Sequence, residues 1–304
     1  MVLSVNLSHL LDPFSARALL PDEERIEWIK QDRWIHYSRA ERVLERLTAL
    51  LHYPPRDRMP CVLLFGATGM GKTSLVQKFL RDYRSSFDAV LGRTRLPVVS
   101  IQMPPAPNER DFYEEILVSM GGVLVAGISI TTLRHRTRIL ARQLEVNMLI
   151  IDEIHSILAG TFREQRIILN AIRFLANDLR IPIVCVGTHD AKQALMTDQQ
   201  LADRFEAVEL RKWEDDATFQ QLSCSFGAIL PLRKSSNLLD AKVRKRVLSL
   251  SEGVLVRICR LLESSAIAAI QTGAERIELG SLDDELGTQG LVSISDRRRR
   301  RVAG

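Results

Sequence analysis

The sequence contains a phosphate-binding loop. Residues 66–73, GATGMGKT, fit the pattern G-x-x-x-x-G-K-[ST] and lie between an apolar run at 61–65 and a helical pattern from residue 72. Glycines let such a loop turn its N–H groups toward phosphate oxygens, while the lysine reaches the β- and γ-phosphates and the threonine ligates Mg²⁺. We therefore expect ATP and Mg²⁺ here; the alternative is a glycine-rich turn without a ligand. The expected contacts are Gly66, Thr68, Gly69, Gly71, Lys72, Thr73 and Ser74.

Two carboxylates follow a second apolar run. Asp152 and Glu153 come directly after residues 149–151, as in a Walker B motif. Asp152 is expected to hold Mg²⁺ with Thr73, directly or through water, and Glu153 to act as general base toward the attacking water. The alternative is an acidic helix N-terminus. Together with Lys72 as a catalytic cation, the pair predicts ATP hydrolysis, although a slow nucleotide switch fits the same residues.

A polar residue follows a third apolar run. Thr188 comes after the predicted strand at 181–186, where it could lie between the carboxylates and the γ-phosphate and hold the water. The alternative is that Thr188 caps the helix that begins at 190.

Two arginines are further candidates. Arg204 precedes the last predicted strand and could reach a neighbouring subunit's ATP as an arginine finger in trans. Arg257 lies on a later helix and could touch the γ-phosphate of its own subunit. An arginine on a helix is otherwise an ordinary solvated side chain.

The elements around these residues predict an α/β fold. Strands are expected at 61–65, 97–102, 147–151, 181–186 and 207–210, and helices at 72–83, 109–120, 131–144, 164–179 and 190–196. Continuous apolar strands that alternate with helices are typical of a parallel sheet covered on both faces.

Four regions are expected along the chain. Residues 1–55 are an N-terminal arm, loose over 1–20, followed by two helices over 22–52. Residues 56–212 are the α/β core, and 213–290 form a helical lid. Residues 291–304 are an arginine-rich tail that is predicted to be disordered, and that either binds DNA or an acidic partner or only aids solubility.

The composition is that of a soluble globular protein with a net charge of +5. Of 42 basic residues, 34 are arginine, which suits phosphate contacts but also fits a bias in genome composition. Three of the 4 cysteines (Cys61, Cys185 and Cys259) lie in apolar runs, which indicates reduced core residues and a cytoplasmic location. No signal peptide or membrane span is predicted. His155 has no second His or Cys at metal-ligand spacing, so we interpret it as a packing or hydrogen-bonding residue.

In combination, these residues resemble the AAA+ ATPases, and more closely the TniB/TnsC group of bacterial transposition proteins. The closer resemblance rests on residues 152–158, 163–166, 169–170, 173–179, 181–184 and 187–188, with additional matches at 58–60 and 230–232, and it covers roughly residues 20–275. It implies an AAA+ P-loop NTPase with a parallel central sheet, an N-terminal helical segment and a C-terminal helical lid.

The resemblance also implies a function. Such proteins assemble on double-stranded DNA as homo-oligomeric rings or helical filaments, recruit a transposase, and act with a target-selector protein. Their ATPase activity dismantles the assembly. No membrane partner is expected.

The DNA contacts are the least defined prediction. Assembly around a duplex requires basic side chains that meet phosphates. Arg134, Arg136 and Arg138 form one basic cluster and Arg93 with Arg95 a second, and either could be an ordinary solvated face.

Two other functions remain open. One is a helicase-loader or initiator ATPase, which would need an additional domain for which the short N-terminal segment leaves little room. The other is a signalling NTPase switch that binds no nucleic acid. ATP-dependent, salt-sensitive DNA binding would distinguish the latter from the first two.

Overall fold

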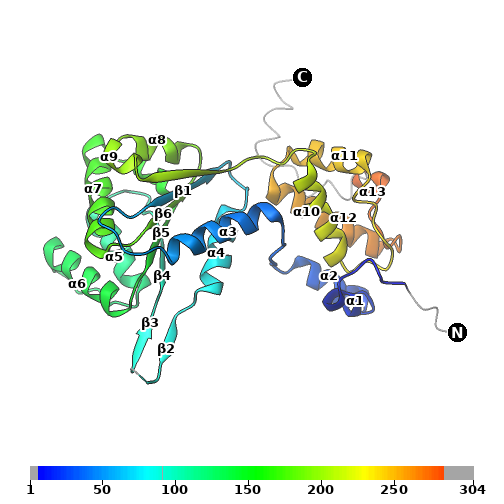
Figure 1. Cartoon of the computed structure of the whole chain (residues 1–304). Coiled ribbons are helices and arrows are strands. Elements are labelled where there is room, and N and C mark those ends of the chain that lie inside the picture. The colour runs from blue at the N-terminus through cyan, green and yellow to red at the C-terminus, as the bar shows by residue number, and fades with distance from the viewer. Residues whose placement is uncertain (1–5, 91, 284–304) are drawn as a thin grey trace. The chain divides into compact units, whose positions relative to one another are not determined.

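The computed structural model describes residues 6–90 and 92–283, and these form two compact units (Figure 1). One unit spans residues 42–211 and contains the sheet. The other combines residues up to 41 with those from 212 onward and is helical. These two units do not coincide with the four regions expected from the sequence. Whether those four regions have separate functions stays a prediction. The predicted tail at 291–304 lies outside the described residues.

The sheet contains five parallel strands in the order β4-β5-β6-β1-β7. Because the three inner strands are buried on both faces, their sequences are continuously apolar rather than alternating. All five predicted strands are confirmed, with ends shifted by up to two residues. The strands are β1 (Cys61–Gly66), β4 (Val98–Gln102), β5 (Met148–Asp152), β6 (Ile183–Gly187) and β7 (Phe205–Leu210).

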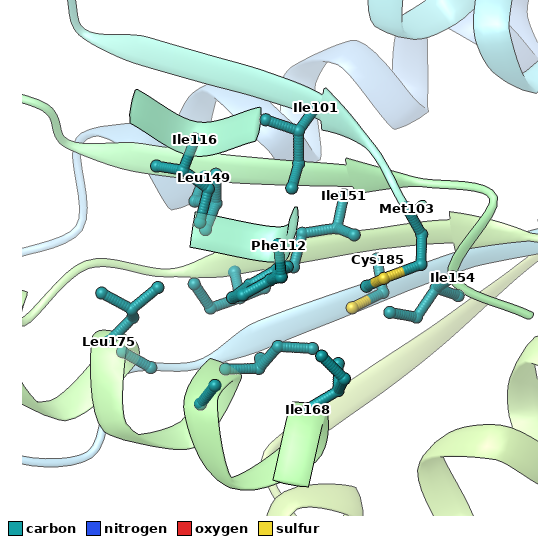
Figure 2. Packing of buried hydrophobic residues seen from close by; sticks show 14 of the residues in the cluster. Ile101, Met103, Phe112, Ile116, Leu149, Ile151, Ile154, Ile168, Leu175 and Cys185 are labelled. Atoms are coloured by element: carbon teal, nitrogen blue, oxygen red, sulfur yellow. The ribbon is translucent and has the colours of Figure 1, made fainter. Parts of the chain in front are cut away.

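Helices cover the sheet and supply its core. Side chains from the strands pack with α5, α6, α7 and α8 in one hydrophobic cluster, and Figure 2 shows members of this cluster from α5 (Phe112), α7 (Ile168) and β5 (Leu149 and Ile151). The five predicted helices of this unit are confirmed. They are α4 (Lys72–Asp82), α5 (Glu109–Ser119), α6 (Ile130–Gln143), α7 (Phe162–Leu179) and α8 (Asp190–Met196).

Several short elements were not predicted because each is too short to show a hydrophobic period. An antiparallel hairpin of β2 (Ser86–Asp88) and β3 (Arg93–Arg95) follows α4 and extends away from the sheet in Figure 1. A 3₁₀ helix, η1 (Ile154–Ala159), follows β5, and α9 (Gln199–Ala202) precedes β7.

The helical unit joins both ends of the described chain. The two predicted N-terminal helices are confirmed as α2 (Asp22–Lys30) and α3 (Ser38–Leu51), which begins in this unit. Arg25 of α2 is fully buried, and its guanidinium donates to both carboxylate oxygens of Glu275 at 2.8 Å. The later helices are α10 (Ala217–Ile229), α11 (Ala241–Ser251), α12 (Leu255–Gln271) and α13 (Leu279–Asp283).

The prediction of a loose arm over residues 1–20 is wrong for part of that range. Residues Asp12–Ala18 form α1, with a proline in its first turn and with Ala18 buried. Seven residues give too few turns for a periodic pattern, so the helix could not be predicted from hydrophobic spacing.

Two of the three cysteines predicted to lie in the core are buried. All four cysteines are free, and Cys61 and Cys185 are buried, whereas Cys259 is only partly buried. Within the described residues, no helix is long and apolar enough to cross a membrane.

Candidate nucleotide-binding site

The phosphate-binding loop connects the carboxyl end of β1 to α4. Gly69 and Gly71 have φ angles of +80° and +83°, a left-handed conformation that strongly favours glycine. Gly66 is required for a different reason, because a Cβ there would lie 2.5 Å from the carbonyl oxygen of Leu210 at the end of β7. The sequence therefore forms a tight loop packed against the neighbouring strand.

Lys72 begins α4 and folds back over the loop. Its Nζ donates to the carbonyl oxygens of Gly66 and Ala67, both at 2.9 Å, and the residue is only 7% exposed. Burial lowers the pKa of the Lys72 ammonium, against the opposing effect of the negative charges of Glu153 and Asp152. A buried cation at the mouth of this loop is well placed to exchange its carbonyl partners for phosphate oxygens.

Asp152 ends β5 and lies beside the loop. The Thr73 hydroxyl donates to its Oδ2 at 3.0 Å, and the backbone N–H of Glu153 donates to its Oδ1 at 2.8 Å. The structure thus brings the two predicted magnesium ligands, 79 positions apart in the chain, into direct contact.

Glu153 has a strained backbone, with φ at +54°. Its side chain is 39% exposed, and its Oε2 lies 3.3 Å from Nε2 of His155. The interpretation of His155 as a packing or hydrogen-bonding residue stays a prediction, since its other ring nitrogen, Nδ1, is buried without a hydrogen-bond partner among the described residues. Among the described residues, no group of three or more His, Cys, Asp or Glu side chains could hold a metal by themselves.

Thr188 follows β6, which lies between β5 and β1. Its hydroxyl is buried and has no hydrogen-bond partner among the described residues. The capping position of α8 is occupied by His189, so the structure does not support a role for Thr188 as the cap. Because a buried hydroxyl without a partner costs free energy, a ligand that supplied the missing hydrogen bond would be favoured at this position.

The donor set fits ATP with Mg²⁺. The Thr73 hydroxyl and the Asp152 carboxylate are hard oxygen ligands of the kind that Mg²⁺ prefers. Lys72 and the glycine loop suit a polyphosphate, and the orphaned Thr188 hydroxyl suits a water or a γ-phosphate oxygen.

Arg204 lies at the opposite edge of the sheet. Its carbonyl accepts from the N–H of Cys61 at the amino end of β1, and its guanidinium donates to Oδ1 of Asn177 at 2.6 Å. The strand β1 separates it from the loop of its own subunit, so a role toward the nucleotide requires another copy of the chain.

Arg257 belongs to the helical unit, whereas the loop belongs to the other unit. It lies in the first turn of α12, and its guanidinium is 3.2 Å from Glu252. Its predicted contact with the γ-phosphate stays a prediction.

The predicted DNA-binding arginines do not form one surface. Arg134 is paired with Glu109 at 2.5 Å and Arg138 with Asp178 at 3.2 Å, whereas Arg136 is exposed. In the second cluster, Arg93 and Arg95 both pair with Glu145, at 2.6 and 2.9 Å.

Sequence reasoning missed three supporting residues. Asn177 holds Arg204, and Arg56 and Arg58 share a hollow with it. The Arg-Asp-Arg sequence at 56–58, just before β1, was the available signal, but only the fold brings it to Arg204.

The parallel sheet with its loop, acidic strand end and helical unit defines the AAA+ fold. Solved structures share it: Cdc6p from Pyrobaculum aerophilum has a TM-score of 0.56 at 18% identity, with 83% of this chain and 68% of that chain covered. The ORC2 protein of Aeropyrum pernix, in ADPNP and ADP complexes, has a TM-score of 0.54 at 16% identity, with coverage of 88% and 72%. The Drosophila ORC bound to DNA has a TM-score of 0.55 at 13% identity, with coverage of 91% and 68%.

The family model of the bacterial TniB protein matches residues 25–215, so the chain belongs to the TniB family. No curated protein sequence matches the chain significantly.

Proposed function

We propose that this protein hydrolyses ATP with Mg²⁺ and uses the nucleotide state to regulate DNA transposition. The observation that carries the enzymatic part is the carboxyl edge of the sheet. There Thr73 meets Asp152 beside the lysine of the loop, and Thr188 presents a buried hydroxyl without a partner.

The residues have separate roles in hydrolysis. Lys72 and the loop N–H groups bind the phosphates, and Thr73 and Asp152 would hold Mg²⁺, which neutralises charge on the phosphates when bound. Glu153 orients water and takes its proton as the water oxygen attacks the γ-phosphorus and the bond to the bridging oxygen breaks. The products are ADP and inorganic phosphate. Thr188 orients the same water.

Arg204 completes the site from a second copy of the chain. It lies at the amino edge, away from its own loop, so a head-to-tail homo-oligomer would place it beside the neighbour's γ-phosphate. In a ring or a helical filament, each active site would then contain residues of two subunits, and turnover would depend on assembly. We assign Arg257 to the γ-phosphate of its own subunit.

Double-stranded DNA is the proposed scaffold for assembly. Membership in the TniB family supports a role in bacterial transposition, and one protein with the same fold is described bound to DNA. A transposase and a target-selector protein are the proposed partners, in the cytoplasm. Arg136 on α6 is the proposed phosphate contact, whereas Arg134 and Arg138 are paired with carboxylates and are not expected to contact DNA directly.

The test is electron microscopy of the purified protein with and without a random-sequence duplex, in ATP with Mg²⁺ and then in ADP. We expect rings or filaments only with DNA and ATP, which disassemble as ATP is consumed. Particles that are unchanged by DNA would contradict the transposition role and favour a protein-scaffold switch. The ATPase proposal is tested separately, by measuring phosphate release.

A further inference from the structure

A cationic hollow lies at the amino edge of the sheet. It has a volume of about 450 Å³, and its lining includes Arg56, Arg58 and Arg204, with Tyr53 and Asp203. The guanidinium of Arg56 lies over the Tyr53 ring, 4.9 Å from its centre, which fixes it at the wall without neutralising its charge.

The three arginines of this hollow are not ion-paired to any described residue. Arg204 donates to the neutral amide of Asn177, and Asp57, between the other two in sequence, pairs with Arg180 instead. Asp203 accepts a hydrogen bond from Gln199 at 2.8 Å. By contrast, Arg93, Arg95, Arg134, Arg138 and Arg142 all meet carboxylates of the same chain.

Three guanidiniums in one concave site select an anion with several oxygens, such as a polyphosphate. The chain's own nucleotide is out of reach, because β1 pairs with β7 over six residues and places the hollow about 17 Å from the loop. At that loop, Lys72 is accompanied by the carboxylates Asp152 and Glu153, so a bound triphosphate needs additional positive charge.

We propose that Arg56 and Arg58, together with Arg204, bind the phosphates of the nucleotide held by the next copy of the chain. This inference rests on the proposed ATPase function and adds two residues to the site in trans. In this arrangement, the hollow of one subunit faces the carboxyl edge of its neighbour. The ATP bound at that edge contacts both subunits.

The experiment compares the double variant R56A/R58A with the matched surface variant R81A/R163A, which also removes two exposed arginines. Phosphate release is measured at saturating ATP on a random-sequence duplex. We expect R56A/R58A to lose about tenfold to a hundredfold in turnover, as expected for lost charged hydrogen bonds, and the control to match wild type. Nucleotide affinity of the isolated monomer should not change.

Mixing then tests whether the arginines act in trans. Subunits with E153Q cannot hydrolyse ATP but still offer their hollow. Added to R56A/R58A subunits, they should restore turnover at sites where an intact hollow meets an intact Glu153. Absence of restoration, or weaker nucleotide binding by the R56A/R58A monomer, would overturn the proposal in favour of a role within one subunit.

The salt dependence of DNA binding tests the other source of phosphate. If the hollow contacted the duplex, the slope of log K against log salt would fall by about 1.8 in R56A/R58A. We expect an unchanged slope; a reduced one would overturn the proposal in favour of DNA. If wild type and R56A/R58A hydrolyse ATP at the same rate, the role of Arg56 and Arg58 in trans is contradicted, but the proposed ATPase function is not. A wild-type chain that neither assembles nor hydrolyses ATP contradicts the proposed function as well.

Discussion

The carboxyl and amino edges of the central sheet differ in whether their charged side chains have partners within the chain. At the carboxyl edge, the charged groups already have partners within the chain, since Lys72 donates to loop carbonyls and Thr73 donates to Asp152, whereas the buried Thr188 hydroxyl has none within the described part of the chain. At the amino edge, Arg56, Arg58 and Arg204 share a hollow and have no carboxylate partner among the described residues. The first edge is preorganised to bind a nucleotide before a second subunit arrives. The second retains charge that another molecule must neutralise, which is the property expected of a surface used in assembly.

The strongest test of this contrast is Arg204→Ala. An arginine supplied in trans contributes about 10³-fold or more to phosphoryl transfer, so the variant should lose the rise in specific activity with protein concentration. Nucleotide affinity of the monomer should remain that of wild type. Phosphate release and binding of a fluorescent nucleotide measure the two quantities. Weaker binding by the monomer would place Arg204 in its own subunit's site and remove the distinction between the edges.

Glu153→Gln tests the carboxyl edge by itself. Loss of a general base should lower turnover by about 10²-fold or more, because the amide cannot take the proton from water. ATP binding should persist, since Asp152 and Thr73 are unchanged, and the ATP-bound assembly should accumulate in electron micrographs. Glu115→Gln, at an exposed position on α5, is the matched control. Normal turnover in Glu153→Gln would eliminate this residue as the base.

Thr188→Val tests whether the Thr188 hydroxyl orients the attacking water or only stabilises the fold. Because the hydroxyl has no partner in the described structure, its replacement by a methyl group should leave the melting temperature nearly unchanged. Turnover should fall by about tenfold if the hydroxyl orients the attacking water. Calorimetry and phosphate release are the measurements. A variant that loses stability but keeps its turnover would show a structural role.

The smallest effects are expected for α6, where internal pairing and exposure can be compared on one helix. Arg136→Ala should reduce the slope of log K for DNA against log salt by about 0.9, the value for one lost phosphate contact. Arg138→Ala should leave the slope unchanged and cost less than about 1 kcal/mol of stability, since its partner Asp178 is also held by Arg142. Equal slopes for the two variants and wild type would exclude this face of α6 as a DNA contact.

Local features of this chain could be predicted from its sequence, and distant ones could not. The phosphate-binding loop is encoded within eight residues, and buried parallel strands are apolar throughout, so both are visible without a structure. The β2–β3 hairpin and α1 are too short to show a hydrophobic period, so they could not be predicted in this way. The hollow depends on β7 lying beside β1, a pairing across 144 positions between Cys61 and Phe205. No sequence pattern near Arg56 predicts that β7, and with it Arg204, lies beside this segment.

The ladder between β1 and β7 has a mechanical consequence. Its six residue pairs run from Cys61 and Phe205 to Gly66 and Leu210, where no room exists even for a methyl group. In the proposed head-to-tail assembly, this ladder would be a stiff connection between consecutive nucleotides, one bound at each end. Loss of a γ-phosphate at one end would free that end to tilt, and the ladder would transmit the tilt to the next nucleotide. Disassembly would therefore travel in one direction from the first hydrolysed site.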